Sequence, residues 1–237
     1  MSTIYYAADS TVQFNSYLTY PQTGISQGLR IYIRDDVEIR SYARNGRSTK
    51  SFIDEGRLDR IKKEIGKGDF LFIQFGHNDE KECDPSRYTK AFGAFSDNLK
   101  MMIKVAKEAG AYPVVISPVY RRLFDENGKT VDDCHLDYPD AMKKVAEEEN
   151  VPYIDLCSLS RAYLDEIGDE ASKELYMYFA PGLYKNFPEG KEDNTHLRYP
   201  GAVVYAGMIA EELKKFGGVY EGLVLTQWPM TENGPWE

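Results

Sequence analysis

The stretch FLFIQFGHND, residues 70–79, decides the fold of this chain. Its first part is short, nearly all apolar and rich in aromatic residues, which predicts a buried strand. Gly76 and three polar residues follow at once, namely His77, Asn78 and Asp79. In open parallel sheets, ligands bind beyond the carboxyl ends of the strands. The stretch therefore predicts a central strand with a candidate site directly after it.

Short apolar runs of this kind recur along the chain, and amphipathic stretches separate them. Strands that alternate with helices predict a parallel sheet covered on both faces, and right-handed crossovers would wind it doubly. We expect an α/β fold of the flavodoxin type, a doubly wound three-layer sandwich with about five parallel strands. The other predicted strands are residues 4–7, 37–43, 112–116 and 151–156, and the predicted helices are residues 57–65, 88–109, 138–150, 158–167 and 201–216.

The organisation of the chain is simple. No linker, repeat or low-complexity stretch interrupts it, which predicts one domain over residues 1–237. The connection 117–137 has no clear element, and long loops in compact domains are often functional. We expect an irregular tail at about residues 225–237.

Composition disfavours several classes of protein. The formal net charge of -9 argues against nucleic acid as a partner, because such binding needs clustered Lys and Arg. No apolar run approaches the roughly 20 residues of a membrane-spanning helix, so no membrane association is expected. Cys83, Cys134 and Cys157 are too widely spaced for a zinc or redox pair. With an N-terminus that lacks a signal-like segment, they favour a cytoplasmic protein. A secreted protein that begins at its mature N-terminus would look the same, and the oligomeric state is not predicted.

Three polar turns follow the first three predicted strands. Ser10 comes after the first, where its hydroxyl can act as a nucleophile or simply cap a helix. Gly46 comes after the second; a glycine lets a backbone N–H approach a ligand, although Asn-Gly is also a common turn. Asn78 comes after the third, and its amide can donate to an oxyanion or cap local backbone groups. Each signal is weak alone, but all three fall on one rim of the predicted sheet.

A fourth signal lies near the C-terminus, where Asp193 precedes His196 by three residues. The carboxylate can bend back to Nδ1 of the ring and leave Nε2 to take a proton, although a solvated loop pair would show the same spacing. We assign His77 to packing or hydrogen bonding. Because the histidines are scattered without metal-ligand spacing, we expect no metal.

These segments, in this order, resemble those of the SGNH (GDSL-type) hydrolases. A narrower match is to the rhamnogalacturonan acetylesterases, and Ala8 stands where that family usually has glycine. A methyl group fits there if φ is negative and the site is roomy. The matching segments are ADSTV at 8–12, NGRSTKSF at 45–52, IQFGHND at 73–79, SPVYRRLF at 117–124 and DNTHLRYPGA at 193–202.

The resemblance implies a role for each residue of the four signals. Ser10 would be the nucleophile of a catalytic triad that Asp193 and His196 complete. The oxyanion donors would be the N–H groups of Ser10 and Gly46 and the side chain of Asn78. The implied fold is the same three-layer α/β sandwich.

The predicted activity is removal of O-acetyl groups from rhamnogalacturonan-type pectic oligosaccharides through an acetyl-serine intermediate. Ester hydrolysis by a serine, a histidine and an aspartate needs no organic cofactor, so none is expected. The expected partner is thus an acetylated oligosaccharide substrate, and arginine suits recognition of its galacturonate carboxylate. Two alternatives remain, a broad-specificity short-chain GDSL esterase or lipase and a catalytically inactive carbohydrate-binding protein. The candidate substrate-binding residues, all in predicted rim loops, are Arg44, Arg47, Arg121, Arg122 and His135.

Overall fold

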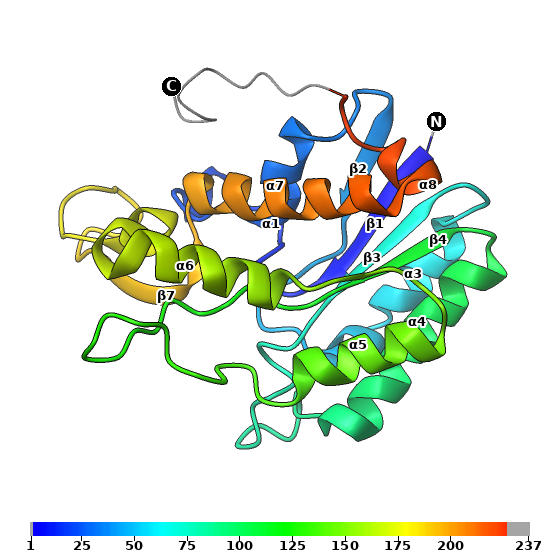
Figure 1. Ribbon diagram of the computed structural model, residues 1–237, viewed down its shortest axis with the longest axis horizontal. Helices are drawn as coiled ribbons and strands as arrows, with labels where there is room; N and C mark the ends of the chain where they lie inside the picture. Colours follow the sequence, from blue (N-terminus) through cyan, green and yellow to red (C-terminus); the bar gives the residue numbers. More distant parts are fainter. Residues whose placement is uncertain (1, 227–237) are drawn as a thin grey trace.

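A computed structural model describes residues 2–226 of the chain (Figure 1). Within this range five parallel strands form one sheet in the order β2-β1-β3-β4-β5, so the predicted parallel sheet is confirmed. Because all of them run in one direction, their carboxyl ends share one rim. The strands are β1 (Ser2–Ala8), β2 (Val37–Ser41), β3 (Phe70–Gln74), β4 (Tyr112–Ile116) and β5 (Tyr153–Ile154).

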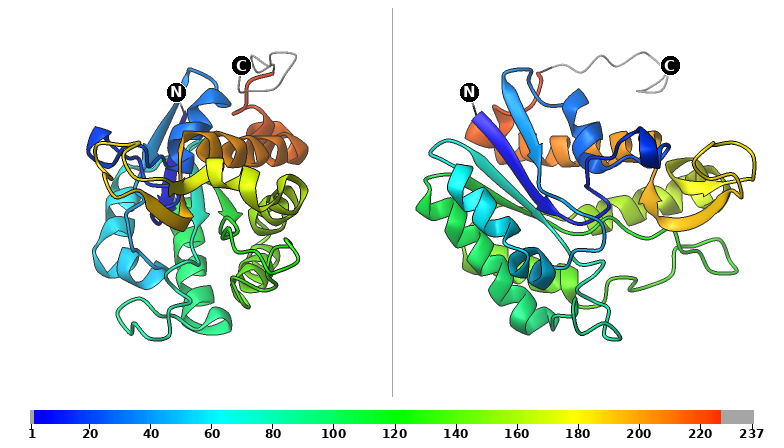
Figure 2. Two further views of the ribbon diagram at one scale, coloured as in Figure 1. Left: turned by 90° about the vertical axis from the view of Figure 1, so that its left-hand side faces the viewer. Right: turned by 180° about the vertical axis from the view of Figure 1, so that it is seen from behind.

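Helices cover both faces of this sheet and complete the predicted three-layer sandwich (Figures 1 and 2). One face is covered by α1 (Ile25–Gly28), α6 (Leu156–Ser172), α7 (Tyr199–Phe216) and α8 (Gly218–Glu221), and the other by α2 (Thr49–Asp54), α3 (Arg57–Glu64), α4 (Ser96–Glu108) and α5 (Tyr138–Glu148). Successive side chains of a strand point to opposite faces. Ile4 and Tyr6 of β1 therefore join the first core, whereas Tyr5 and Ala7 join the second.

The predicted helices at residues 57–65, 138–150, 158–167 and 201–216 are present, and α6 extends beyond its predicted ends. The prediction that a helix begins at residue 88 is wrong, because α4 begins at Ser96. The chain enters α4 through an irregular turn, η3 (Ala91–Phe95), in which Gly93 has φ −141° and ψ −122°. Just before it, Thr89 donates its N–H and its hydroxyl to Asp79. These bonds hold the segment against the loop that follows β3, outside a helix.

A small antiparallel sheet, which the sequence did not predict, lies beyond the carboxyl ends of the central strands. It pairs β6 (Tyr176–Phe179) with β7 (Lys191–Leu197). β7 reads KEDNTHL and lacks the alternation of apolar and polar residues that marks a strand. The pair lies at the left of Figure 1, and the left view of Figure 2 looks onto this rim. Short 3-10 turns complete the fold at η1 (Tyr17–Thr19), η2 (Leu29–Ile31) and η4 (Lys173–Leu175).

The remaining segments bear on the other predictions. The connection 117–137 is irregular, as predicted, apart from an isolated bridge between Phe124 and Thr130. All but the first two residues of the predicted tail at 225–237 lie outside the described residues. No helix within residues 2–226 is both long and apolar enough to cross a membrane. The thiols of Cys83, Cys134 and Cys157 are free.

Candidate active site

Ser10 lies in the turn directly after β1 and is 7% exposed. The capping of this turn falls to its neighbour, because the Asp9 carboxylate accepts the N–H and the hydroxyl of Thr11, both at 2.9 Å. The Ser10 hydroxyl points instead to the ring of His196, with 2.9 Å between Oγ and Nε2. Ala8, the last residue of β1, is buried in the core. Its methyl group is part of the core cluster on the α7 face of the sheet.

Asp193 and His196 meet through a bulge in β7. Tyr178 pairs with Glu192 and Tyr176 pairs with Leu197, so residues 193–196 lie opposite Met177 alone. Three residues apart in a regular strand, the two side chains would point to opposite faces. In the bulge, Asp193 Oδ1 accepts the N–H groups of Thr195 and His196 at 2.9 and 3.0 Å. Its Oδ2 is then free to accept from His196 Nδ1 at 2.8 Å.

The electrostatics of this pair favour an ionised carboxylate. Burial alone would raise the pKa of Asp193, but hydrogen bonds from His196 and from the backbone hold it well below its usual value. An ionised Asp193 accepts the proton of Nδ1 and fixes the tautomer in which Nε2 carries a lone pair. That lone pair faces the Ser10 hydroxyl. The arrangement can abstract a proton from the serine.

Gly46 and Asn78 line the same cleft as Ser10. Gly46 has φ +74°, a conformation that favours glycine. The Asn78 amide donates from Nδ2 to the carbonyl of Arg47 at 3.1 Å, which leaves its second N–H for a ligand. The next residue, Asp79, accepts the N–H of Thr49 at 2.9 Å, at the start of α2, whose N-cap is Ser48. Gly46 and Asn78 therefore line the cleft that holds the serine, and Asn78 keeps one side-chain N–H without a partner among residues 2–226.

The cleft has a volume of about 460 Å³, and most of its exposed surface is polar. Its lining is made of glycine and polar side chains, namely Ser10, Gln22, Asn45, Gly46, His77, Asn78, Lys81, Arg87, Arg121, Lys191, Asp193, Thr195 and His196. Asp193 is the one carboxylate among these described lining residues, whereas several are cationic. Cationic side chains thus outnumber carboxylates in the lining, although carboxylates pair with three of the four cations at 2.7 to 3.7 Å.

Of the five predicted substrate-binding residues, Arg121 lines this cleft and the other four do not. Arg44 faces solvent outside the cleft. Arg47 turns away to Glu55, with an ion pair of 2.6 Å. Arg122 is buried, because its Nε donates to Asn194 Oδ1 at 2.9 Å and its guanidinium pairs with Asp169.

His135, the last of the five candidates, is 1% exposed and belongs to an ion network with Glu80 and Arg121. Its Nδ1 faces Glu80 Oε2 at 3.0 Å and its Nε2 faces the carbonyl of Val119 at 3.0 Å. Both partners only accept, so both ring nitrogens carry protons. Burial alone would lower the pKa of His135, but hydrogen bonds with Cys134 and Glu80 raise it to about 9. The ring is therefore charged at neutral pH.

This network also accounts for the one cluster of possible metal ligands among residues 2–226. His77, Glu80 and His135 have ligand atoms within 4.8 Å of one another. A protonated His135 offers no lone pair to a metal, and the second Glu80 oxygen binds Arg121 Nη2 at 2.7 Å. Burial holds the pKa of His77 well below its usual value, and its neutral ring packs edge to face with His135. The cluster is an ion network with a packed histidine, and neither ring nitrogen of His77 has a hydrogen-bond partner among residues 2–226.

Sequence comparison decides the family. Residues 4–202 match the model of the GDSL-like lipase/acylhydrolase family. The chain belongs to this family. It is also 40% identical over 214 residues to rhamnogalacturonan acetylesterase RhgT of Bacillus subtilis, with 90% of each chain covered. The probable rhamnogalacturonan acetylesterase YesY of the same organism is 40% identical over 214 residues, covering 90% of this chain and 93% of the relative. The chain is thus a carboxylic ester hydrolase.

Solved structures agree with the fold of this GDSL-like hydrolase. The crystal structure of YxiM from Bacillus subtilis has a TM-score of 0.78 at 30% identity, covering 91% of this chain and 57% of that one. Axe2, an acetylxylan esterase from Geobacillus stearothermophilus, has a TM-score of 0.59 at 13% identity, covering 95% of this chain and 97% of that one. The second likeness concerns the fold alone.

Sequence reasoning missed three cations of the cleft of this hydrolase, Lys81, Arg87 and Lys191. Lys81 stands three residues after Asn78, so its position just past the polar turn was a usable signal. Arg87 and Lys191 reach the cleft through the irregular loop before α4 and through β7, neither of which the sequence predicted.

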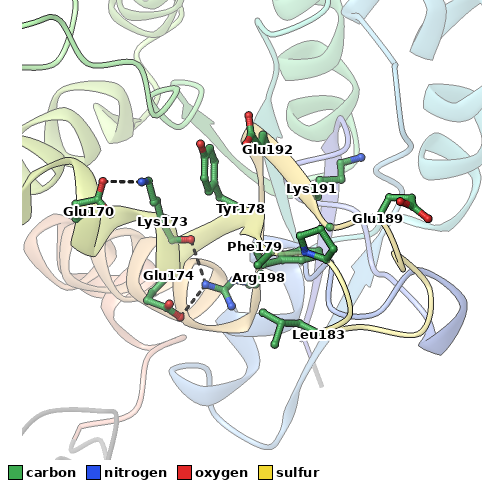
Figure 3. A pocket seen from close by; sticks show the side chains of 13 residues that line it. Glu170, Lys173, Glu174, Tyr178, Phe179, Leu183, Glu189, Lys191, Glu192 and Arg198 are labelled. Carbon is green, nitrogen blue, oxygen red and sulfur yellow. Dashed lines mark hydrogen bonds and ion pairs between the residues drawn. The ribbon is translucent and has the colours of Figure 1, made fainter.

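A larger hollow of about 800 Å³ lies on the outer side of β6 and β7 (Figure 3). Two of its basic side chains are paired, Lys173 with Glu170 at 2.6 Å and Arg198 with Glu174 at 2.7 Å. The third, Lys191, also lines the polar cleft. The ring of Tyr178 has the guanidinium of Arg122 4.5 Å and the ammonium of Lys173 5.1 Å from its centroid. No nucleophile–base pair of the described residues lies there. The smaller polar cleft is the candidate active site of this hydrolase.

Proposed function

We propose that the chain is a serine carbohydrate esterase that removes O-acetyl groups from rhamnogalacturonan-type pectic oligosaccharides through an acetyl-serine intermediate. The observation that supports it most is the hydrogen-bonded series from Ser10 through His196 to Asp193 in the polar cleft. The names of the two relatives at 40% identity support the acetylated substrate.

In the first half-reaction, His196 Nε2 takes the proton of Ser10 as Oγ attacks the acetyl carbonyl carbon. The electron pair displaced onto the carbonyl oxygen is stabilised by the N–H groups of Ser10, Gly46 and the Asn78 amide. Each such donor is typically worth about 3 to 4 kcal/mol of barrier. When the tetrahedral intermediate collapses, the bond to the sugar oxygen breaks and His196 returns the proton to that oxygen. The sugar leaves and the acetyl group stays on the serine.

In the second half-reaction, water attacks the acetyl-serine while His196 takes one of its protons. The intermediate collapses with release of acetate, and the proton returns to Oγ. The chemistry needs only residues of this chain.

The lining of the cleft favours a substrate with a small acyl group on a charged sugar. A long acyl chain needs an apolar channel, whereas glycine and polar side chains line this cleft. Galacturonate brings a carboxylate, and four cations line the cleft, namely Lys81, Arg87, Arg121 and Lys191. These cations take the place of the arginine group expected from the sequence, of which Arg121 alone remains.

The decisive experiment measures acetate release from acetylated rhamnogalacturonan fragments by the purified chain and by Ser10→Ala. We expect the substitution to abolish release, with Ser158→Ala as a control because Ser158 is exposed on α6. Release by Ser10→Ala at the parent rate would refute the serine mechanism. Equal turnover of acetylated xylo-oligosaccharides, which are uncharged, would refute the preference for a pectic substrate but leave the mechanism intact.

A further inference from the structure

Two cations converge on the carbonyl oxygen of the Asn78 side chain. Lys81 Nζ lies 3.2 Å and Arg87 Nη1 lies 3.4 Å from Asn78 Oδ1. On the other side, Nδ2 donates to the carbonyl of Arg47 at 3.1 Å. Asn78 is only 4% exposed. The amide is thus held between two donors and one acceptor.

These contacts select one orientation of the amide. If it turned over, its NH₂ group would face both cations, and its oxygen would face the carbonyl of Arg47. Both faces would then be repulsive. In the observed orientation the second N–H of Nδ2 is available to the cleft, which is where the proposed oxyanion forms.

Neither cation is fully used by other partners. Among residues 2–226, no carboxylate lies within 4 Å of Lys81 Nζ. Arg87 pairs with Asp84 through Nε at 3.0 Å, which leaves Nη1 for Asn78. The same guanidinium lies against Gly46, since a Cβ built on that glycine would be 3.4 Å from Nη1. Positive charge therefore lies beside both Gly46 and Asn78.

We infer that Lys81 and Arg87 are positioning residues that lock the Asn78 amide with its N–H toward the oxyanion and increase the strength of that donor. A cation at Oδ1 draws electron density from the amide, and bonded groups polarise one another in this way inside proteins. A donor already fixed and polarised stabilises developing charge without reorganising. The inference rests on the proposed function, because it assigns these two residues to the proposed ester hydrolysis.

A double-mutant cycle tests whether the cations act through Asn78. The substrate is p-nitrophenyl acetate, which has no carboxylate, so recognition of an anionic sugar does not contribute. We expect Lys81→Met/Arg87→Met to lower kcat roughly ten- to hundredfold with little change in KM, because hydrogen bonds to charged groups are lost. Asn78→Ala should lower kcat by roughly 100- to 1,000-fold. In the Asn78→Ala background the two cation substitutions should change kcat by less than about twofold.

Matched variants separate this role from a loss of charge. Lys81→Arg/Arg87→Lys keeps both charges and should recover most of kcat. Lys90→Met/Arg60→Met also removes two positive charges, from exposed positions outside the cleft, and should leave kcat unchanged.

Three results would overturn the inference. The first is an equal loss of kcat with and without Asn78, and the second is no loss in the otherwise unaltered chain. The third is an effect restricted to KM for carboxylate-bearing sugars, which would make the two cations a substrate-binding pair. A parent protein inactive on every acetyl ester would refute the proposed function instead.

Discussion

The Asp79 carboxylate accepts the main-chain N–H of Thr49 at 2.9 Å and also accepts its hydroxyl. Thr49 begins α2 just after the Gly46 turn, and Asp79 directly follows Asn78. The Asp79–Thr49 contact therefore joins the two segments that carry Gly46 and Asn78, both of which line the cleft with the serine. Burial raises the pKa of Asp79 to about 7, even though the hydroxyl of Thr89 also donates to it at 2.7 Å.

Replacing Asp79 with alanine should impair both folding and turnover. The buried donors of Thr49 and Thr89 would lose their acceptor, which costs about 1 to 3 kcal/mol for each donor left unpaired. With the Gly46 and Asn78 segments no longer joined, we expect kcat on p-nitrophenyl acetate to fall more than KM rises. Urea denaturation and steady-state kinetics measure the two effects, with Asp54→Ala at an exposed position as the control. A less stable variant with the parent kcat would limit Asp79 to a structural role.

The charged His135 should make stability depend on pH. Its pKa is raised from 6.5 to about 9 in the folded chain, so the folded state holds the proton more tightly than the unfolded state. The stabilisation is then complete below about pH 6.5 and is lost as the pH rises through about 9. Its upper limit is roughly 3 kcal/mol.

Unfolding free energies of the parent and of His135→Gln, measured by urea denaturation from pH 6 to about pH 9, test this. We expect the difference between the two proteins to shrink as the pH rises. Parallel curves would show that His135 is not charged in the folded chain.

Asp193→Asn should abolish turnover with little loss of stability. The asparagine oxygen can still accept the N–H groups of Thr195 and His196, so the bulge in β7 stays formed. Its NH₂ group would face Nδ1 of His196 and make that nitrogen an acceptor. The proton would then lie on Nε2, which could no longer take the proton of Ser10. Loss of this tautomer costs about 10⁴-fold in kcat in serine proteases.

The control for this substitution is Glu192→Gln, an exposed neighbour that loses the same charge. We expect it to keep the parent kcat, and circular dichroism melts to match for all three proteins. If Asp193→Asn retained more than about a tenth of the parent kcat, Asp193 would not be the residue that orients the base.

The central sheet was predictable because the apolar residues of each strand indicate, without further information, that the strand is buried. Residues 70–74 are buried on both faces and nearly all apolar, so neighbouring strands need not be known. β6 and β7 were not predictable, because β7 is polar and its pairing is interrupted by four residues opposite Met177. The bulge depends on the hydrogen bonds of Asp193, and the alternation of apolar and polar residues in the sequence does not predict such bonds.

The site was predictable only where the sheet itself positions the residues. Ser10 and Asn78 follow strands, so their common rim comes from the topology. The sequence could not show which cations reach the cleft, because the orientation of each side chain depends on partners distant in sequence. Arg121 forms an ion pair with Glu80. Its neighbour Arg122 donates a hydrogen bond to Asn194 and forms an ion pair with Asp169. Adjacent arginines in one loop thus have different environments.

Those environments predict opposite phenotypes for the two arginines. Arg121 lines the cleft and donates from Nη1 to Thr195 Oγ1 at 2.8 Å, between Asp193 and His196 in sequence. Arg121→Gln should therefore lower kcat/KM on p-nitrophenyl acetate, and lower it further on acetylated galacturonate oligosaccharides. Arg122→Gln removes a buried guanidinium that bonds Asn194 and stacks on Tyr178, so it should cost about 2 to 3 kcal/mol of unfolding free energy. Under conditions where it stays folded, it should retain the parent's preference between the two substrates.

Kinetics on both substrates and urea denaturation distinguish the two variants. A loss of substrate preference in Arg122→Gln alone would reverse the assignment.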